Sequence, residues 1–329
     1  MEYRIALGQI APRLGELDAN LELAAATVRD AAGQGADLVV LPELALTGYL
    51  LQDLVPEVAL RADDPRLAAI GAEAPDSLIA IGFAEETPEH RYCNSVALLR
   101  GREVLGVHQK VYLPTYGLFD EGRFTRPGHR IRSLPVDEPI GRIGLSVCED
   151  FWHPFLPMLQ VQDGASLLVN VAAGPARAPG SAAGLAAIGG WHKMQETYAL
   201  LGTVAVAFCN RVGNEEGLTF WGGSRLLGPD GGVIAQAPLY EEVLIVGALE
   251  TDDLRMQRYN LPIVADERLE LVRREVDRMI AERAGIAGPP VLDATAEEAV
   301  EGARGAPDGG APDGGARNCA ARAGAADPT

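Results

Sequence analysis

The chain has 329 residues, of which 47% are hydrophobic, so it can bury a substantial core in one or two domains and is not disordered throughout. Its 28 basic and 46 acidic residues give a net charge of −18, which repels the phosphates of nucleic acids and anionic lipids. Neither a hydrophobic run of membrane-spanning length nor a secretory signal follows Met1. We therefore expect a cytoplasmic protein that binds neither nucleic acid nor membrane.

The four cysteines, Cys93, Cys148, Cys209 and Cys319, show no C-x-x-C spacing, and the five histidines show no H-x-x-x-H pair. Scattered cysteines argue against a disulfide framework, a zinc knuckle or a redox pair. Scattered histidines give no metal-ligand spacing. We expect neither a metal nor another cofactor, and each cysteine is either buried filler or a reactive thiol.

Strand-like segments alternate with helix-like segments along the chain. A strand over residues 3–9 precedes a helix that Asp18 caps and that Gly33 and Gly35 end. Further strands are predicted over 37–41, 78–84, 92–99, 103–109, 142–148, 166–171, 203–209, 223–228 and 243–249, and further helices over 154–162 and 182–201. The pair Gly231-Gly232 predicts a hairpin turn. This interleaving is typical of the α/β class.

The C-terminal part of the chain changes in composition. A last amphipathic helix is predicted over 265–284, with an apolar face that must dock on another surface. From residue 287 the chain has no aromatic side chain, and residues 305–316 form a small direct repeat. Such a segment cannot bury enough apolar area to offset its ordering entropy. We predict one domain over 1–286 and a disordered, low-complexity tail over 287–329.

Three predicted strands end abruptly in a reactive side chain, and these side chains are Glu43, Lys110 and Cys148. The carboxyl ends of strands are where α/β proteins tend to gather their chemistry. A single residue of any of these types is more often buried filler or a solvated charge. Their joint occurrence at strand ends favours convergence in one site.

A carboxylate, an ammonium and a thiol together suit acyl transfer. Glu43 as the base takes the proton of the Cys148 thiol, which becomes the nucleophile. Attack on an amide carbon creates an oxyanion, which the Lys110 ammonium and the backbone N–H of Glu149 are suited to stabilise. Glu43 then passes its proton to the leaving amine and activates the water that hydrolyses the thioester.

The blocks around these residues resemble those of the nitrilase superfamily of carbon–nitrogen hydrolases. They are Leu41-Pro42-Glu43, Lys110-Val111-Tyr112-Leu113-Pro114 and Cys148-Glu149-Asp150-Phe151-Trp152, in the family's order and separated by 67 and 38 residues. A fourth block, from Asn210 to Ser224, resembles a segment of the amidase and carbamoylase branches. The similarity covers residues 1 to 265 or so.

Within the superfamily, the segments 116–124 and 148–150 look most like the glutaminase domain of glutamine-dependent NAD synthetase. That domain is normally fused to an ATP-using synthetase module, and no Ser-Gly-Gly-x-x-Ser-type phosphate loop follows here. Ala172, Ala173 and Gly174 stand where those glutaminases usually offer serine. The chain thus resembles a free-standing amidase, or a glutaminase that works with a separate NAD synthetase.

The resemblance implies an α/β four-layer α-β-β-α sandwich, assembled as a homodimer or higher homo-oligomer, without metal or organic cofactor. It implies Glu43 as the base, Lys110 as the oxyanion stabiliser and Cys148 as the nucleophile. It also implies that Glu121 holds Lys110 and positions the substrate. The other predicted substrate-binding residues are Tyr116, Glu149, Phe151 and Trp152. We expect the three aromatic rings to line the pocket.

We therefore expect an amidase that hydrolyses a linear, non-peptide carboxamide to carboxylic acid and ammonia through a cysteine thioester. The alternatives are a glutaminase that supplies ammonia to a separate synthetase and an N-carbamoyl amide hydrolase. Glutamine would need a partner for its carboxylate, for which Arg177 and Arg211 are candidates, with surface pairing as the equal alternative.

Two rival interpretations stay open at this stage. One is a Cys–His mechanism in which His153 or His108 is the base, although nothing in the sequence orients either imidazole. The other is an inactive relative that acts as a binding subunit, which the three filled reactive positions disfavour. Cys93 and Cys209 lie inside apolar strands and are expected to be filler.

Overall fold

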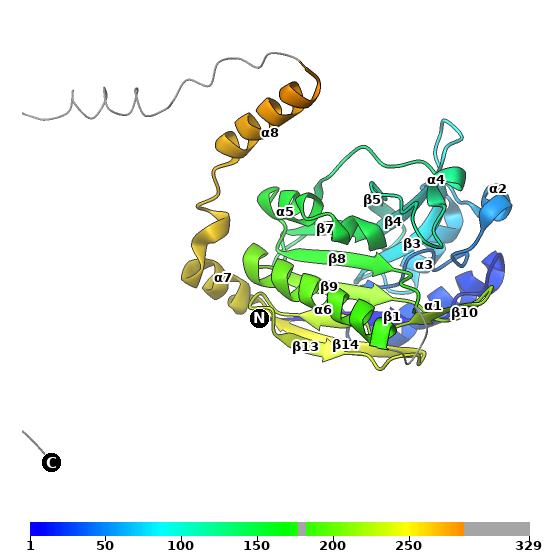
Figure 1. Ribbon diagram of the computed structural model, residues 1–329. Coiled ribbons are helices and arrows are strands. Elements are labelled where there is room, and N and C mark those ends of the chain that lie inside the picture. The colour runs from blue at the N-terminus through cyan, green and yellow to red at the C-terminus, as the bar shows by residue number, and fades with distance from the viewer. Residues whose placement is uncertain (177–181, 286–329) are drawn as a thin grey trace, which may run out of the picture. The chain divides into compact units, whose positions relative to one another are not determined.

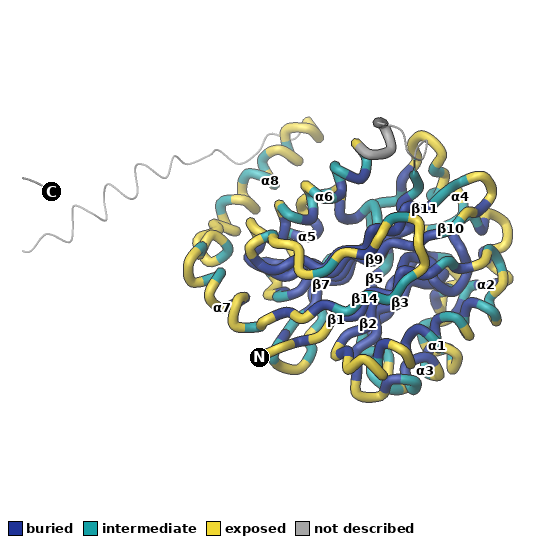
Figure 2. The backbone as a smooth tube through the Cα atoms, turned by 90° about the horizontal axis from the view of Figure 1, so that it is seen from below, coloured by how far each residue is buried: buried dark blue, intermediate teal, exposed yellow. Residues whose placement is uncertain are grey.

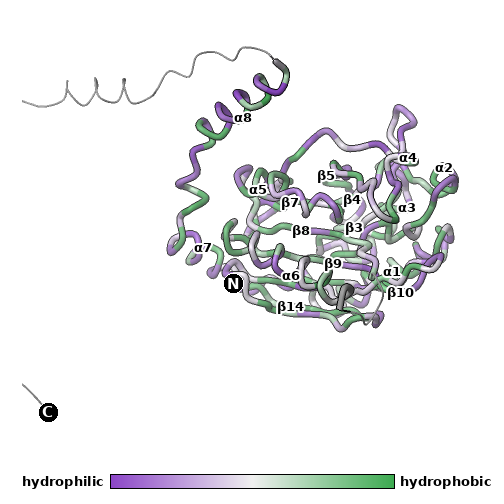
Figure 3. The backbone as a smooth tube through the Cα atoms, viewed as in Figure 1, coloured by the Kyte–Doolittle hydropathy of each residue, from purple (hydrophilic) through white to green (hydrophobic). Residues whose placement is uncertain are grey.

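The computed structural model describes residues 1–176 and 182–285. The chain divides into two compact units, Met1–Glu267 and Arg268–Thr329. The predicted boundary at residue 286 differs from this division, because the last helix, α8 (Leu269–Arg283), belongs to the second unit. α8 carries both hydrophobic and hydrophilic residues along its length (Figure 3), and Leu269, Val272, Val276 and Met279 follow the three- and four-residue spacing of an amphipathic helix. The predicted tail over 287–329 lies outside the described residues.

The first of two six-stranded sheets has the order β14-β1-β2-β3-β4-β5. Its strands are β14 (Val243–Glu250), β1 (Glu2–Gln9), β2 (Leu38–Val40), β3 (Leu78–Glu86), β4 (Tyr92–Arg100) and β5 (Glu103–Gln109). The central strands β1, β2 and β3 are parallel, and the remaining pairs are antiparallel. Parallel neighbours need a crossover connection, which α1 (Leu17–Gly33) and α3 (Pro65–Ala72) supply.

The second sheet has the order β13-β12-β9-β8-β7-β6. Its strands are β13 (Val233–Gln236), β12 (Arg225–Leu227), β9 (Ala205–Asn210), β8 (Leu167–Ala172), β7 (Arg142–Val147) and β6 (Ser133–Pro135). Here β7, β8 and β9 are parallel, with α5 (Phe155–Gln162) and α6 (Ala182–Gly202) in the crossovers. Read from β6, the second sheet repeats the pairing pattern that the first shows from β14.

Three apolar clusters stack these elements into four layers. Successive strand residues point to opposite faces, so Leu38 and Val40 pack between the two sheets while Val39 and Leu41 pack under α1 and α3. A third cluster lies between the second sheet and the helices α5 and α6 (Figure 1). The buried strands form the interior, and the exposed residues lie on helices and loops (Figure 2). The predicted α-β-β-α sandwich is thereby confirmed.

Most predicted strands and helices are present, and the elements that the sequence analysis missed are short. They are β6, β13, the hairpin β10 (Val212–Glu215) and β11 (Leu218–Trp221), the helices α2 (Val55–Val58), α3, α4 (Glu121–Phe124) and α7 (Thr251–Asn260), and the 3-10 helices η1 (Gln52–Leu54), η2 (Cys148–Trp152) and η3 (Pro262–Val264). Segments this short carry too few repeats for a periodicity to show. The predicted hairpin at Gly231-Gly232 joins β12 to β13. The predicted Asp18 cap is wrong, because α1 begins at Leu17 and Asp18 lies in its first turn.

Within residues 1–176 and 182–285, no helix combines the length and the apolar character that a membrane crossing requires.

Candidate active site

Glu43 lies in a tight turn that follows β2. Gly82 on β3 makes this turn possible, because a Cβ at that position would lie 2.4 Å from the carbonyl oxygen of Pro42 and 2.7 Å from the Cα of Glu43. The next residue, Leu44, has a φ of 49°, a conformation that non-glycine residues rarely adopt. The turn therefore presses the Glu43 backbone against β3 and points its fully buried carboxylate inward.

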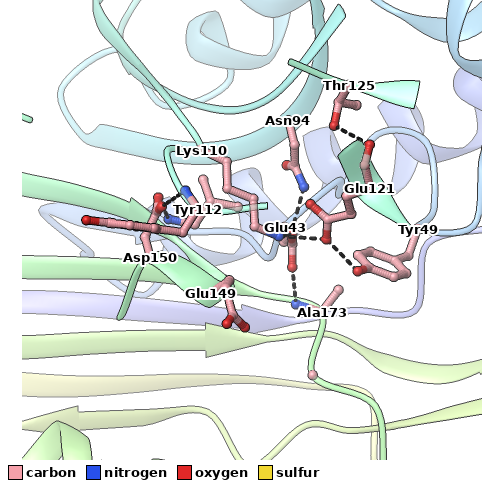
Figure 4. A network of polar contacts seen from close by, with 12 residues as sticks. Glu43, Tyr49, Asn94, Lys110, Tyr112, Glu121, Thr125, Glu149, Asp150 and Ala173 are labelled. Carbon is pink, nitrogen blue, oxygen red and sulfur yellow. Dashed lines mark hydrogen bonds and ion pairs between the residues drawn. The ribbon is translucent and has the colours of Figure 1, made fainter. Parts of the chain in front are cut away.

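The Lys110 ammonium lies between two carboxylates (Figure 4). Its Nζ is 2.8 Å from Glu43 Oε1 and 2.7 Å from Glu121 Oε1, and the lysine side chain is fully buried. Glu43 also accepts hydrogen bonds from Asn94 Nδ2 at 2.7 Å and from the backbone N–H of Ala173 at 2.7 Å. Three donors thus hold this carboxylate in place. We call Glu43, Lys110 and Glu121 the acidic cluster.

Charge interactions within the acidic cluster shift its proton affinities. Burial alone would lower the pKa of Lys110, but Glu121 and Glu43 outweigh it and raise that pKa well above its usual value. Burial raises the pKa of Glu121, and the Lys110 charge opposes this rise. Burial and the neighbouring Glu121 also raise the pKa of Tyr49, whose hydroxyl donates to Glu121 Oε1. Lys110 therefore stays an ammonium, and Tyr49 stays a neutral hydrogen-bond donor.

Cys148 stands where β7 ends and η2 begins. Its φ is 45°, so the nucleophile candidate occupies a strained turn, as functional residues often do. Burial and then the Glu43 charge raise the pKa of its thiol well above the usual value, and Lys110 opposes them. The Ala173 N–H, which donates to Glu43, lowers that pKa. The thiol and the Glu43 carboxylate are thus both influenced by one backbone N–H.

A second polar group surrounds Glu149, the residue after Cys148. Its side chain is 12% exposed and accepts hydrogen bonds from the Tyr116 hydroxyl at 2.9 and 3.1 Å. His153 Nε2 lies 3.9 Å from Glu149 Oε1, and the His153 ring stacks on Tyr112 at 3.6 Å. Burial raises the pKa of Glu149, and the Tyr116 hydrogen bond opposes this. A mostly buried carboxylate on the residue after the nucleophile candidate is suited to bind a cationic group.

Two of the aromatic residues predicted to line the pocket lie elsewhere. Phe151 is fully buried in the cluster beneath the helices, where its ring meets Tyr198 of α6 at 5.0 Å. Trp152 packs edge-on against Trp191 of the same helix at 5.2 Å and is 42% exposed. The 3-10 turn η2 carries both rings to the helix side of the second sheet, so we correct their assignment to packing. Tyr116 and Glu149 stay as candidates.

The structure places both candidate histidine bases beside carboxylates rather than beside the thiol. His108 Nε2 bonds to the fully buried Asp150 at 2.8 Å. His153 faces Glu149, as described above. Arg211 is also unsuited to bind substrate, because it is 1% exposed and pairs with Glu215 at 2.6 Å. Arg177 lies outside the described residues.

The sequence analysis missed three contributors to the acidic cluster. Asn94 comes from the middle of an apolar strand, where no pattern marks it. The Ala173 contribution is a backbone N–H, which residue type does not reveal. Tyr49 lies six residues after Glu43, and this closeness in sequence is the signal that could have flagged it.

A small cavity of about 50 Å³ borders this cluster and is lined by Tyr49, Asn94 and Glu121 among others. Asn94 Oδ1 and Glu121 Oε2 are buried and have no hydrogen-bond donor among the described residues. The volume of the cavity is large enough for one water molecule. In the ranges that the structure describes, no group of three or more His, Cys, Asp and Glu side chains is arranged to hold a metal ion.

Comparison with known proteins identifies the class. Residues 4–259 match the family model of carbon-nitrogen hydrolases. The chain therefore belongs to the carbon–nitrogen hydrolase family and is an enzyme that hydrolyses carbon–nitrogen bonds other than peptide bonds.

Individual relatives carry different activities in their names. A glutamine-dependent NAD(+) synthetase from Thermotoga maritima is 32% identical over 76% of this chain and 42% of its own length. The chain thus spans less than half of that relative. An N-carbamoylputrescine amidase from Arabidopsis thaliana is 24% identical over 78% of this chain and 90% of its own length.

A solved amidase from Nesterenkonia sp. AN1 superposes with a TM-score of 0.67 at 27% identity, covering 82% of this chain and 95% of that one. A mutant of that amidase shows covalent addition of the acetamide moiety of fluoroacetamide at the active-site cysteine.

Proposed function

We propose that the protein is an amidase that cleaves a linear, non-peptide carboxamide through a thioester on Cys148. The observation that carries this proposal is the position of the Ala173 N–H, which donates to the Glu43 carboxylate at 2.7 Å and also lowers the pKa of the Cys148 thiol. Because the pKa of the thiol is raised, a base has to take its proton during each turnover. Glu43 is the carboxylate in position to do so.

The proposed reaction has two halves. Glu43 removes the thiol proton, the sulfur attacks the amide carbon, and the oxyanion accepts from the Lys110 ammonium and the Glu149 backbone N–H. The carbon–nitrogen bond breaks as Glu43 returns the proton to nitrogen, so that ammonia leaves and a thioester stays. Glu43 then takes a proton from water, which attacks the thioester, and the released thiolate regains that proton. Asn94 and Tyr49 hold the two carboxylates in place throughout.

The side chain of Glu149 indicates which class of amide substrates the site would bind. It is a mostly buried carboxylate, bound by the Tyr116 hydroxyl and adjacent in sequence to the nucleophile. A buried carboxylate is stabilised by a cationic partner. We therefore infer that the amide substrate carries an ammonium group a few bonds from the scissile carbon. N-carbamoylputrescine and glutamine both have such a group.

A glutaminase is the second candidate, and the likeness to the Thermotoga maritima synthetase favours it. In that case ammonia would pass to a separate NAD synthetase. The absence of hydroxyl groups from Ala172, Ala173 and Gly174 speaks for the amine-bearing amides without a carboxylate. The predicted homo-oligomer and the synthetase partner both stay predictions.

Ammonia release from a panel of amides tests the proposal. The panel contains acetamide, glutamine and N-carbamoylputrescine, and we expect the two ammonium-bearing amides to be hydrolysed faster. Glu149→Gln should raise their KM while it leaves the rate with acetamide little changed, since acetamide has no charge to bind. Equal loss with all three amides would contradict the assignment of Glu149. A silent panel, with Cys148→Ala as the background, would contradict the amidase.

A further inference from the structure

A larger cavity of about 380 Å³ lies apart from Cys148. Three segments form its walls: the loop between β3 and β4, the end of β5, and residues 126–130. Nothing in the proposed amide hydrolysis uses it. Its volume falls within the range of small-molecule sites.

The side chains around this cavity carry a surplus of positive charge. The cations are Arg91, Arg126 and Arg130, and the acids are Glu85 and Glu89. None of the three guanidinium groups forms an ion pair with a carboxylate in the part of the chain that the structure describes. The protein has a net charge of −18, so three arginines without a carboxylate partner around one cavity indicate a binding site for an anion.

Neither acid of the cavity forms an ion pair with these arginines in the described residues. Glu85 is 6% exposed, and its carboxylate already accepts from Ser95 Oγ at 2.6 Å and from Gln109 Nε2 at 3.0 Å. Glu89 is exposed on the loop after β3. Arg126 Nη1 donates to the Gly122 carbonyl at 3.3 Å, and the charges of all three guanidinium groups are left without a carboxylate partner in the described residues.

The cavity wall is continuous with the backbone of Lys110. His108 and Gln109 line the cavity and immediately precede Lys110 on β5. On the other side, the backbone N–H of Gly128 donates to the Lys110 carbonyl at 2.8 Å. A Cβ at Gly128 would lie 2.3 Å from the Gln109 carbonyl oxygen, so the two walls are in close contact. A ligand in the cavity would press on both.

A buried hydrogen-bond network leads from the cavity to the nucleophile. His108 Nε2 bonds to Asp150 Oδ2 at 2.8 Å, and the same oxygen accepts from the backbone N–H of Val147 at 3.0 Å. Asp150 Oδ1 accepts from the N–H groups of Val111 and Tyr112, both at 2.9 Å (Figure 4). Asp150 thus links the backbone that follows Lys110 to the backbone that precedes Cys148 through hydrogen bonds.

We propose that this cavity binds a small polyanion and that its occupancy raises turnover at Cys148. Guanidinium groups bind phosphate and carboxylate oxygens in the same bidentate manner, so the ligand class is a compact molecule with phosphate groups or several carboxylates. The bound anion draws the walls together and fixes His108, and through Asp150 it orders the turns that carry Lys110 and Cys148. The binding part stands by itself, whereas the turnover part rests on the proposed function.

Calorimetry of the full-length protein tests the binding part, with pyrophosphate and citrate as probes at constant ionic strength. We expect saturable binding of at least one probe, weakened roughly tenfold or more in the Arg126→Gln/Arg130→Gln variant because charge-assisted hydrogen bonds are lost. The matched control is Arg102→Gln, an exposed arginine at the opposite end of β5, which should bind as the wild type does. Binding of pyrophosphate alone identifies a phosphate ligand, and binding of citrate alone a carboxylate ligand. No saturable binding, or equal binding to the double variant, would refute the site.

Initial rates with the best amide of the panel test the turnover part. The bound probe should raise kcat/KM about fivefold or more in the wild type, and the double variant should keep its basal rate but lose the response. His108→Gln should bind the probe without responding to it. Binding without any change in rate would refute the coupling and leave the site intact. If no amide is hydrolysed at all, the proposed function fails, and the calorimetry still decides on the site.

Discussion

In the described residues, two buried groups that pair lysine or arginine with glutamate are built differently. In the acidic cluster, one ammonium, that of Lys110, lies between the carboxylates of Glu43 and Glu121. In the other group, Arg211 pairs with Glu215 alone. The first group therefore has a surplus of negative charge beside a thiol, and the second is balanced.

The Arg211–Glu215 pair, which we call the balanced pair, contacts backbone groups and an aromatic ring. Glu215 Oε1 accepts from the backbone N–H groups of Tyr49 at 2.9 Å and Leu50 at 2.6 Å. Arg211 donates to the Pro12 carbonyl at 3.0 Å, and its guanidinium lies 4.2 Å from the centre of the Phe220 ring. Such a pair fixes backbone segments, whereas a cluster with a carboxylate in excess can accept and return a proton. The two are joined through Tyr49, whose backbone Glu215 holds and whose hydroxyl binds Glu121.

Removing the thiol should have the largest effect on activity. Cys148→Ala is expected to lower kcat by about 10⁴-fold or more, since the nucleophile is lost. The variant should fold, because the residue is only partly buried. Cys209→Ala is the matched control, since Cys209 is fully buried among apolar residues and should affect stability more than turnover. Comparable turnover in the Cys148 variant would contradict the thioester.

Glu43→Gln removes the proposed general base from the acidic cluster. It should lower kcat by roughly 10²–10⁴-fold, the usual contribution of general acid–base catalysis. The glutamine side chain matches the glutamate side chain in size, but its amide group does not accept a proton near neutral pH. Circular dichroism and the melting temperature serve as the check on folding. A variant with near-normal kcat would show that another group is the base, and His153→Ala would then be the next test.

Glu215→Gln tests the balanced pair and should show the opposite pattern. Breaking one partner of a buried ion pair costs about 3–5 kcal/mol of unfolding free energy, measurable by urea denaturation. Turnover at a temperature where the variant is folded should fall much less than in Glu43→Gln. A large loss of kcat without a loss of stability would mean that the pair takes part in the chemistry.

We expect activity to change with pH because the Glu121 carboxyl group gains or loses a proton. This is the smallest of the expected effects. Burial raises the pKa of Glu121 above its ordinary value of 4.5. As the pH falls through this raised pKa, the carboxyl takes up a proton and Lys110 loses a charged partner, so kcat/KM should decline at a pH above 4.5. The folded protein binds this proton more tightly than the unfolded chain does, so the group's contribution to stability is present at low pH and lost as the pH rises through the folded pKa. Glu121→Gln should remove this part of the pH profile, and an unchanged profile would contradict the assignment.

The sequence predicts the site as far as strand ends and residue types allow. Glu43, Lys110 and Cys148 each follow an apolar strand, and that rule placed Lys110 correctly beside Glu43. It cannot reveal a backbone donor such as the Ala173 N–H, because any residue supplies one. It also failed for Phe151 and Trp152, since the direction of a side chain depends on the 3-10 turn after Cys148.

The fold was predictable for a related reason. Strands such as β2, β8 and β9 are buried on both faces, so they read as continuous apolar runs. Short elements such as β6 and α4 depend on contacts with distant parts of the chain, and local pattern does not encode them. The same limit applies to the cavity beside Lys110, whose arginines come from loops.

The central claim is that Cys148, alone among the three cysteines of the described residues, is activated as a nucleophile. Burial raises the pKa of Cys93 to about 11 and that of Cys209 further, and neither thiol has the Glu43 carboxylate and the Ala173 N–H as neighbours. The most direct measurement is peptide mapping by mass spectrometry after incubation of the full-length protein with fluoroacetamide. We predict one acetamide group per chain, on Cys148, with its rate reduced by a competing amide substrate. Labelling of Cys93 or Cys209 in its place would contradict the account.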